Sequence, residues 1–301
     1  MVNLTNNNLS SYNRLFRFFV FLALMLLGYS LLFFVFLIEN LVVRDGFADT
    51  ELLMLQFLLF ETLPVILFFI IFKNKINVKK SLSLRKISFI NLGYILVLQI
   101  CISPLITLVN YIGLFFADNV TVEYINSMDM PFLLMMLLIG IIGPALEEII
   151  FRGIILDITR GKSLRFMAIV SGITFALFHM DINQFSYAFI LGTVFAVYVT
   201  YTGSIFSAFF AHFLVNGSSV VLLGLQKYIL NNFPEYLDES LTSTELVFNI
   251  YEFIFIIISA IIFMIGFKFI FKKFKKYNEE NNEYFMYGVG ASLKKIEEDV
   301  V

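Results

Sequence analysis

Tryptophan is absent from this 301-residue sequence, cysteine occurs once and histidine only twice. Because Cys101 has no partner in the chain, there is neither a disulfide framework nor a cysteine-based metal site to consider. The sequence also lacks a His-Glu-x-x-His segment, which excludes the zinc site of soluble metalloproteases. Charged residues make up 15% of the chain and the net charge is −2. The clustered basic surface of a general nucleic-acid binder is therefore missing.

Long apolar runs are what the sequence does contain. Hydrophobic residues account for 59% of the chain and the mean hydropathy is +0.88, which is typical of an integral membrane protein. The first run, from Phe18 to Ile38, leads directly into Glu39 and shows no small-x-small cleavage site. We therefore expect an uncleaved spanning helix there rather than a signal peptide. In the absence of tryptophan, tyrosine alone would form the aromatic belt at the membrane surface.

With about 20 apolar residues needed for each crossing, the runs predict an all-α polytopic membrane bundle of about eight transmembrane helices. The predicted helices cover residues 17–38, 52–72, 88–116, 131–156, 164–180, 184–201, 204–227 and 246–271. The fourth is expected to break near Gly143-Pro144, because proline removes an internal hydrogen bond. Only Thr202-Gly203 separate the sixth helix from the seventh, which requires a tight turn.

The loops alternate in charge, which predicts the orientation of the bundle. Residues 73–86 carry six bases and no acid, whereas residues 117–130 carry three acids and no base. Because cytoplasmic loops are enriched in Lys and Arg, both termini are predicted to be cytoplasmic. We divide the chain into helices 1–3 (1–130), a core of helices 4–7 (131–227), an outer loop with the eighth helix (228–271) and a cytoplasmic tail (272–301). From about Asn278 the tail is polar, and we expect it to be a mobile extension.

Three ionisable groups lie within the fourth apolar run, in Glu147-Glu148-Ile-Ile-Phe-Arg152. Ionisable side chains inside a membrane are costly and mark candidate functional sites. Residues four apart share a helix face, so we expect Arg152 to neutralise Glu148 and to leave Glu147, about 100° away, facing another helix. A buried ion-pair network with only a structural role is the competing interpretation.

Both histidines lie in charge-free apolar runs. His179 follows Phe175 by one helical turn and His212 precedes Asn216 by one turn, so the members of each pair share a helix face. Small residues continue the face of His212, which would let another helix approach closely. The competing interpretations are a satisfied core histidine for His212 and ordinary packing for the phenyl ring of Phe175.

Depth along the helices indicates whether these groups can meet. Glu147 and His179 lie sixteen residues on either side of the turn near Ser163, which puts them level. His212 lies nine residues past Gly203, about 13 Å below the cytoplasmic face at about 1.5 Å per residue. We therefore expect one site that opens toward the cytoplasmic side.

Glu61 is a further acid within an apolar run, three residues before Pro64. One interpretation makes it a substrate-groove or proton-handling residue. The other makes it the partner of a polar group on a neighbouring helix. The sequence leaves both open.

The segments Glu147-Glu148-x-x-x-Arg152, Phe175-x-x-x-His179 and His212-x-x-x-Asn216 resemble the three ordered motifs of the CAAX protease and bacteriocin-processing family, also called the Abi family of intramembrane proteases. The resemblance covers roughly residues 144–216, and every motif position is present. It implies hydrolysis of a peptide bond inside the membrane, with Glu147 as the water-activating residue. The two histidines and the asparagine match positions that bind a metal, or that orient the water and stabilise the oxyanion.

Two mechanisms remain open at this point. In the first, His179, His212 and Glu147 hold a zinc ion, which lowers the pKa of its bound water to about 7. In the second, no metal takes part, and Glu147 and His179 act as general bases. His212 and Asn216 then donate hydrogen bonds to the oxyanion, each contributing about 3 kcal/mol.

The resemblance predicts an endopeptidase that acts on a membrane-associated peptide or protein within the lipid bilayer and binds no nucleic acid. Abundant Phe, Ile, Asn and Lys resemble the product of an AT-rich bacterial genome, so we expect a bacterial plasma membrane. One competing function is a non-catalytic immunity or scaffold protein that binds a bacteriocin or signalling partner. Another is a proton-coupled carrier that uses Glu61 and the two histidines, which the absence of an internal repeat disfavours.

Overall fold

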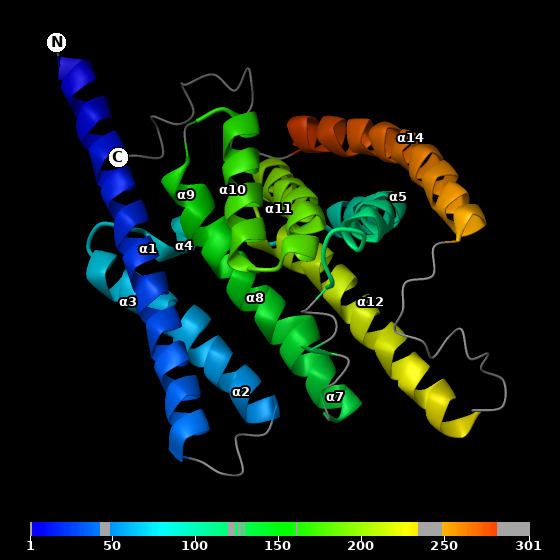
Figure 1. The fold of residues 1–301 in the computed structure, drawn as a ribbon. Coiled ribbons are helices and arrows are strands. Elements are labelled where there is room, and N and C mark those ends of the chain that lie inside the picture. The colour runs from blue at the N-terminus through cyan, green and yellow to red at the C-terminus, as the bar shows by residue number, and fades with distance from the viewer. Residues whose placement is uncertain are drawn as a thin grey trace.

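The structure is a computed structural model, in which residues 2–42, 49–119, 124–125, 128, 130–160, 162–233 and 249–281 are described. Every regular element in these ranges is helical (Figure 1). The elements are α1 (Val2–Val42), α2 (Asp49–Gln56), η1 (Phe57–Thr62), α3 (Leu63–Phe72), α4 (Val78–Ser81), α5 (Phe89–Gly113), α7 (Phe132–Met135), η2 (Met136–Ile142), α8 (Gly143–Glu148), η3 (Ile149–Ile155), α9 (Leu156–Ile158), α10 (Leu164–Phe178), α11 (Ile182–Thr202), α12 (Ile205–Asn232) and α14 (Ile250–Asn281), where η marks a π-helical segment.

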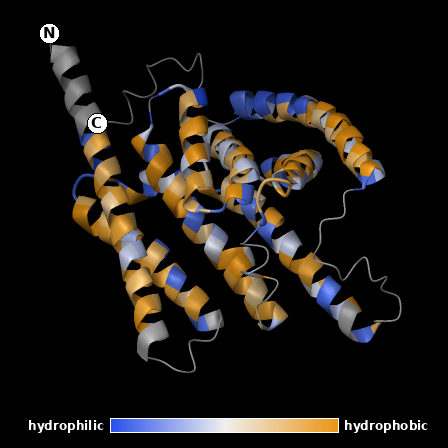
Figure 2. Ribbon diagram, viewed as in Figure 1, coloured by the Kyte–Doolittle hydropathy of each residue, from blue (hydrophilic) through white to orange (hydrophobic). Residues whose placement is uncertain are grey.

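Within the described residues, seven helical stretches are long and apolar enough to cross a membrane. They are Asn13–Ile38, Glu51–Phe72, Phe89–Gly113, Phe132–Ile158, Ile182–Thr202, Ile205–Ile229 and Ile250–Asn281, and hydrophobic residues dominate them in Figure 2. The helix predicted at residues 164–180 is present as α10. Its 15 residues span only about 22 Å, less than a hydrocarbon core of about 30 Å. The predicted all-α multi-pass membrane fold is confirmed, with one of its eight helices too short for a full crossing.

Polar residues define where the helices around the cavity begin. The side chains of Ser163, Asp181 and Ser204 accept hydrogen bonds from backbone N–H groups in the first turns of α10, α11 and α12. These bonds satisfy donors that the start of a helix leaves unpaired. Gly203 adopts φ 65° between α11 and α12, a conformation that glycine permits at little cost. The predicted tight turn is confirmed.

The predicted break near Gly143-Pro144 is a change of helix type. The π-helical segment η2 passes into α8 without interrupting the helix. The same succession occurs where η1 leads into α3 at Pro64. Proline has no N–H for the carbonyl four residues before it, and a wider turn before each proline accommodates the missing bond. Glu61 and Glu147 each lie three residues from one of these prolines.

The last helix continues ten residues past its predicted end at residue 271, and Asn278 on α14 is fully buried. Its side-chain amide exchanges hydrogen bonds of 3.0 and 2.9 Å with that of Asn91 on α5. The expectation of a mobile extension beginning near Asn278 is therefore wrong for residues 278–281, because α5 supplies a polar partner. The rest of the tail and the acids predicted for the outer loop at residues 234–248 lie outside the described residues.

Two helix pairs form the body of the bundle, α10 against α11 and α5 against α14, and α12 packs on both α11 and α5 (Figure 1). The α10–α11 contact is close at Gly172 and Gly192. A Cβ atom added to Gly192 would lie 3.0 Å from Cα of Gly172 and 2.9 Å from Cβ of Phe175. Because small residues let two backbones approach, the last turn of α10, which carries His179 at its end, is held firmly against α11.

Candidate active site

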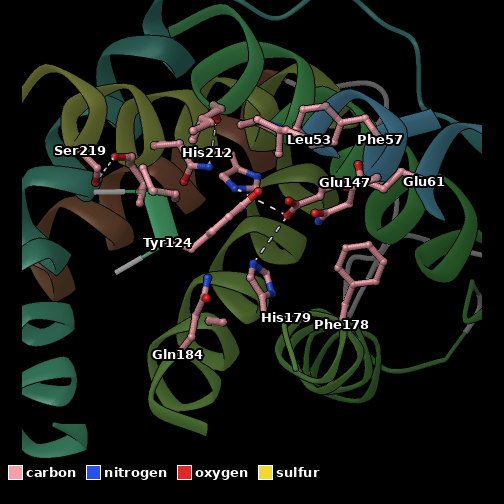
Figure 3. Close-up of a pocket in the computed structure, with 18 of the residues that line it drawn as sticks. Leu53, Phe57, Glu61, Tyr124, Glu147, Phe178, His179, Gln184, His212 and Ser219 are labelled. Atoms are coloured by element: carbon pink, nitrogen blue, oxygen red, sulfur yellow. Dashed lines mark hydrogen bonds and ion pairs between the residues drawn. The ribbon is translucent and has the colours of Figure 1, made fainter. Parts of the chain in front are cut away.

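The four residues proposed from the sequence as catalytic meet at one cavity. Glu147 comes from α8, His179 follows the last residue of α10, and His212 and Asn216 come from α12. All four line a cavity of about 440 Å³. The Nε2 atoms of both histidines lie 3.9 Å from Oε2 of Glu147, as the dashed lines in Figure 3 show. The depth argument correctly predicted that these groups can meet.

A backbone carbonyl orients His179. Its Nδ1 lies 2.8 Å from the carbonyl oxygen of Phe175, one turn earlier in the chain. A carbonyl oxygen only accepts hydrogen bonds, so Nδ1 carries the proton and donates it. In the neutral ring, Nε2 is then unprotonated and its lone pair is directed at Glu147.

A buried carboxylate orients His212 in the corresponding way. Nδ1 of His212 lies 2.8 Å from Oε1 of Glu148, and neither side chain is more than 4% exposed. The ionised carboxylate accepts a hydrogen bond from Nδ1–H, so the proton stays on Nδ1. Nε2 of the neutral ring is therefore also a lone-pair acceptor that faces Glu147. Two imidazoles and one carboxylate thus present acceptors to the same small volume.

Arg152 compensates the charge of Glu148, as the four-residue spacing predicted. One guanidinium nitrogen donates to Oε1 of Glu148 at 3.1 Å and another donates to the carbonyl oxygen of Gly192 at 3.1 Å. The guanidinium carbon also lies 4.7 and 5.2 Å from the ring centroids of Phe175 and Phe195, where cation–π attraction favours it. Arg152 forms its ion pair with Glu148 and not with Glu147, so the buried ion pair uses only one of the two adjacent glutamates.

Phe175 does more than fill space. Its ring packs edge-on against His179, with centroids 4.7 Å apart, and against His212, with centroids 5.6 Å apart. The same residue supplies the carbonyl that orients His179 and a face for the guanidinium of Arg152. The interpretation of this ring as ordinary packing is therefore too narrow.

Asn216 reaches across to the helix that carries Glu147. Its Nδ2 donates to the carbonyl oxygen of Ile139, in the π-helical segment η2, at 3.3 Å. A side-chain amide has two N–H donors. The second one is left for a group inside the cavity that Asn216 lines.

The sequence profile of the family described as "Type II CAAX prenyl endopeptidase Rce1-like" matches residues 129–218. This segment contains α8, α10, α11 and the part of α12 that carries His212 and Asn216. A Bacillus subtilis protein named "Putative membrane peptidase YdiL" is 32% identical over 115 residues, which are 38% of this chain and 45% of that protein. Both matches support the resemblance to the CAAX protease and bacteriocin-processing family. Residues 129–218 are called the CAAX protease segment below.

The alignment with that relative covers less than half of its length, and no solved structure matches this chain significantly. Every residue of the three motifs lies inside the CAAX protease segment. The helices that precede residue 129 lie outside it, although two of them, α1 and the α2–η1 stretch, contribute walls to the same cavity.

Glu61 is the main addition from outside the CAAX protease segment. It lies in η1, is 1% exposed and lines the cavity that Glu147 lines (Figure 3). Its Oε2 has no hydrogen-bond partner, so the expected polar partner on a neighbouring helix is not found for that oxygen. The position favours the other interpretation, a residue that faces substrate or handles protons.

Sequence reasoning missed three contributors to the site: the ring of Phe195, the carbonyl of Gly192 and the carbonyl of Ile139. Each acts through a ring face or a backbone atom, so the side-chain pattern carries no polar signal for it. Gly192, a small residue in an apolar helix, indicated at most a close helix contact.

The donor types of His179, His212 and Glu147 suit zinc, but their spacing does not. Adjacent ligands of tetrahedral zinc, with bonds of about 2.0–2.1 Å, lie about 3.4 Å apart. Both histidine nitrogens lie 3.9 Å from Glu147. Within the described residues, no group of three His, Cys, Asp or Glu side chains has the spacing of a metal site. We therefore derive no step through a metal.

Proposed function

We propose that this protein is an intramembrane endopeptidase that hydrolyses a peptide bond in a membrane-associated peptide or protein. The proposal rests on one observation above all: two imidazole Nε2 atoms and an unpartnered carboxylate oxygen of Glu147 face one another in a cavity inside a multi-pass membrane bundle. The match of residues 129–218 to a protease family supports it.

In the proposed reaction a water molecule is held between Glu147 and His179. Its two hydrogens are donated to Oε2 of Glu147 and Nε2 of His179, and its oxygen attacks the carbonyl carbon of the substrate. Glu147 takes the proton as the new C–O bond forms, which is general-base catalysis of a kind that contributes about 10²- to 10⁴-fold. When the tetrahedral intermediate collapses, the C–N bond breaks and Glu147 passes the proton to the leaving amine nitrogen.

His212 and Asn216 are proposed to stabilise the oxyanion of the intermediate. Nε2 is an acceptor in the neutral ring described above and a donor when the ring is protonated. In both forms Nδ1–H donates to Glu148, whose negative charge favours an imidazolium formed beside it during the reaction. The second N–H of Asn216 supplies another donor from one turn further along α12. A single pre-positioned donor of this kind accelerates acyl transfer by about 10²- to 10³-fold.

The cavity walls favour internal cleavage of a peptide. Its acidic and imidazole lining residues are Glu61, Glu147 and the two histidines, and no Lys or Arg of the described chain lines it. A terminal carboxylate would find no cation there. We therefore propose an endopeptidase with no requirement for a free substrate C-terminus.

The test compares protein termini in membranes and medium of cells that express wild-type protein, Glu147→Gln or Glu252→Gln. Glu252 is an exposed acid at the start of α14, so its variant controls for the loss of one carboxylate. We expect a substrate terminus with wild type and Glu252→Gln that is absent with Glu147→Gln. Purified wild-type protein and Glu252→Gln, assayed on the peptide so identified, should keep their activity in the presence of a metal chelator.

Identical termini in all three cell lines, with equal amounts of protein in the membrane, would contradict the protease proposal. That result would favour the non-catalytic immunity or scaffold function. Loss of activity on chelation, with recovery when zinc is returned, would refute the metal-free mechanism but leave the endopeptidase proposal intact.

A further inference from the structure

The cavity occupies only one half of the helical bundle. On α12 its lining residues lie between residues 212 and 223, away from the turn at Gly203. On α11 they lie between residues 184 and 191, in the first half of that helix. On α10 they lie only from residue 175 onward, at its end. All three stretches belong to the half of the bundle that faces away from the α11–α12 turn.

The short α10 helix explains this asymmetry. Because α10 ends at Phe178, the α10–α11 hairpin leaves the far part of the bundle without packing from these two helices. The rim of the cavity there includes Met180 and Tyr124, which are 65% and 38% exposed. Its deep end includes Glu61 and Phe175, which are 1% and 2% exposed. The cavity therefore runs inward from that far side.

The near side of the bundle is closed beneath the site. A buried cluster of aromatic and aliphatic residues lies there, including Phe68, Phe72, Ile154 and Ile155. Beyond it, Asp157 forms ion pairs with Arg17 at 3.3 Å and with Arg160 at 2.9 Å. Arg160 also donates to the backbone carbonyl of Lys80 at 3.1 Å. Three parts of the chain, α1, the end of α4 and the segment around α9, are thus joined across this face.

The closed side carries the basic segments at residues 73–86, 160–165 and 272–276, the last of them within α14. Toward the far side, Lys227 on α12 is the only Lys or Arg among the residues that the structure describes. Loops rich in Lys and Arg stay in the cytoplasm. We expected a site that opens to the cytoplasm, but the hollow end of the bundle lies opposite the basic segments. Depth along a helix does not determine which end of a bundle is hollow. We infer that substrates reach Glu147 from the extracytoplasmic side of the membrane.

The chemistry of the walls indicates what enters. This step rests on the proposed peptidase function. The described lining is mostly aliphatic and aromatic and includes Leu53, Phe57, Val220 and Leu223. Its fixed charges are acidic, and no Lys or Arg of the described chain lines it. The occupant is an extended peptide segment with apolar side chains and no acidic residue near the scissile bond, because an acid there would face Glu61 and Glu147 uncompensated.

Cysteine accessibility tests the direction of access without requiring activity. In a Cys101→Ala background, single cysteines replace Ser219 or Met180 at the rim, or Lys79 in the basic loop; all three native side chains are exposed. Intact cells and permeabilised cells are treated with a membrane-impermeant maleimide. We expect both rim cysteines to be labelled in intact cells and the Lys79→Cys protein only after permeabilisation.

The inference would be overturned if both rim cysteines were labelled only after permeabilisation. This holds whether Lys79→Cys is labelled in intact cells or, like the rim cysteines, only after permeabilisation. Two rim positions are used so that one misfolded variant does not decide the result. The labelling result tests only the direction of access, so a cytoplasmic opening would not contradict the peptidase proposal. Conversely, an absence of cleavage would contradict the peptidase proposal without changing the labelling result.

Cleavage of a reporter whose cleavage site lies on a known side of the membrane tests the same inference. The cleaved peptide found by comparing termini is placed next to the membrane span of a reporter, either outside or in the cytoplasm. Wild-type protein should cut only the outside version, and Glu147→Gln should cut neither. Adding one Asp next to the scissile bond should lower cleavage at least tenfold. Cleavage of only the cytoplasmic version would refute extracytoplasmic access.

Discussion

Replacing Glu148 by glutamine separates the structural role of this residue from its effect on His212. Oε1 of Glu148 accepts from Nδ1 of His212 at 2.8 Å and from Arg152 at 3.1 Å, while Oε2 has no hydrogen-bond partner. The amide of Glu148→Gln is nearly isosteric and can keep one oxygen in the place of Oε1. What it removes is the charge that balances Arg152 and fixes the Nδ1 proton of His212.

Glu148→Gln lowers stability because it leaves the buried positive charge of Arg152 without its negative partner. Removing one partner of a buried ion pair costs about 3–5 kcal/mol. Arg152 keeps the carbonyl of Gly192 and the faces of Phe175 and Phe195, so we expect the lower end, about 3 kcal/mol. Combining Glu148→Gln with Arg152→Met removes both charges, and the double variant should recover all but about 1 kcal/mol.

Activity should behave differently from stability. In Glu148→Gln the amide oxygen still accepts from Nδ1–H of His212, but the negative charge beside the ring is lost. The neutral ring then presents only the lone pair of Nε2, and the protonated ring that would donate to the oxyanion is no longer stabilised. We expect cleavage to fall by about 100-fold or more. The double variant should regain stability without regaining activity, because the acceptor charge is still missing.

The assay combines thermal or denaturant unfolding in detergent with cleavage of the peptide identified from the termini comparison. Glu252→Gln serves as the matched control and should change neither property. Activity within a few-fold of wild type in Glu148→Gln, alongside lost stability, would show that Glu148 serves only the ion pair. Unchanged stability would refute the buried-charge reasoning itself.

Two further predictions concern the walls of the site. Gly192→Ala should lower the free energy of unfolding by about 1–3 kcal/mol and reduce cleavage, because its Cβ would lie 3.0 Å from Gly172 and 2.9 Å from Phe175. Gly93→Ala, with nothing within 4 Å of the new Cβ, should lose no stability; equal losses in both variants would contradict the close-packing argument. Glu61→Met should raise the free energy of unfolding by about 1 kcal/mol, because it removes a buried oxygen without a partner, and should reduce cleavage. Lower stability in Glu61→Met would indicate that the carboxylate has a structural partner.

Interactions within one helix could be predicted from the sequence. The spacing of Glu148 and Arg152 led to their ion pair, and the Thr202-Gly203 sequence led to the turn between α11 and α12. The reason is that a helix repeats every 3.6 residues whatever surrounds it, so spacing alone determines which side chains share a face. The apolar runs likewise determined the membrane fold, since a crossing needs about 20 apolar residues.

Helix boundaries were harder to predict from the sequence, because they depend on contacts with other parts of the chain. The last helix continues to Asn281 because Asn91, far away in the chain, accepts and donates to Asn278. The fourth helix does not break at Pro144, because a π-helical turn accommodates the missing N–H. The sequence shows that Asn278 is polar and that Pro144 lacks an N–H donor. It does not show which neighbouring residue or helix turn compensates for either.

Only the tertiary structure decided how the helices face one another. The sequence determined a membrane bundle with two histidines, an acid pair and an asparagine at helical spacings. That Glu148 supports His212, that both imidazoles face Glu147, and that Glu61 lines the same cavity all depend on contacts between separate helices. The same holds for the direction of access, because the hollow end is set by where α10 stops relative to its neighbours. Helix periodicity is local physics, whereas the relative depth and rotation of packed helices follow from small residues and shapes along every interface at once.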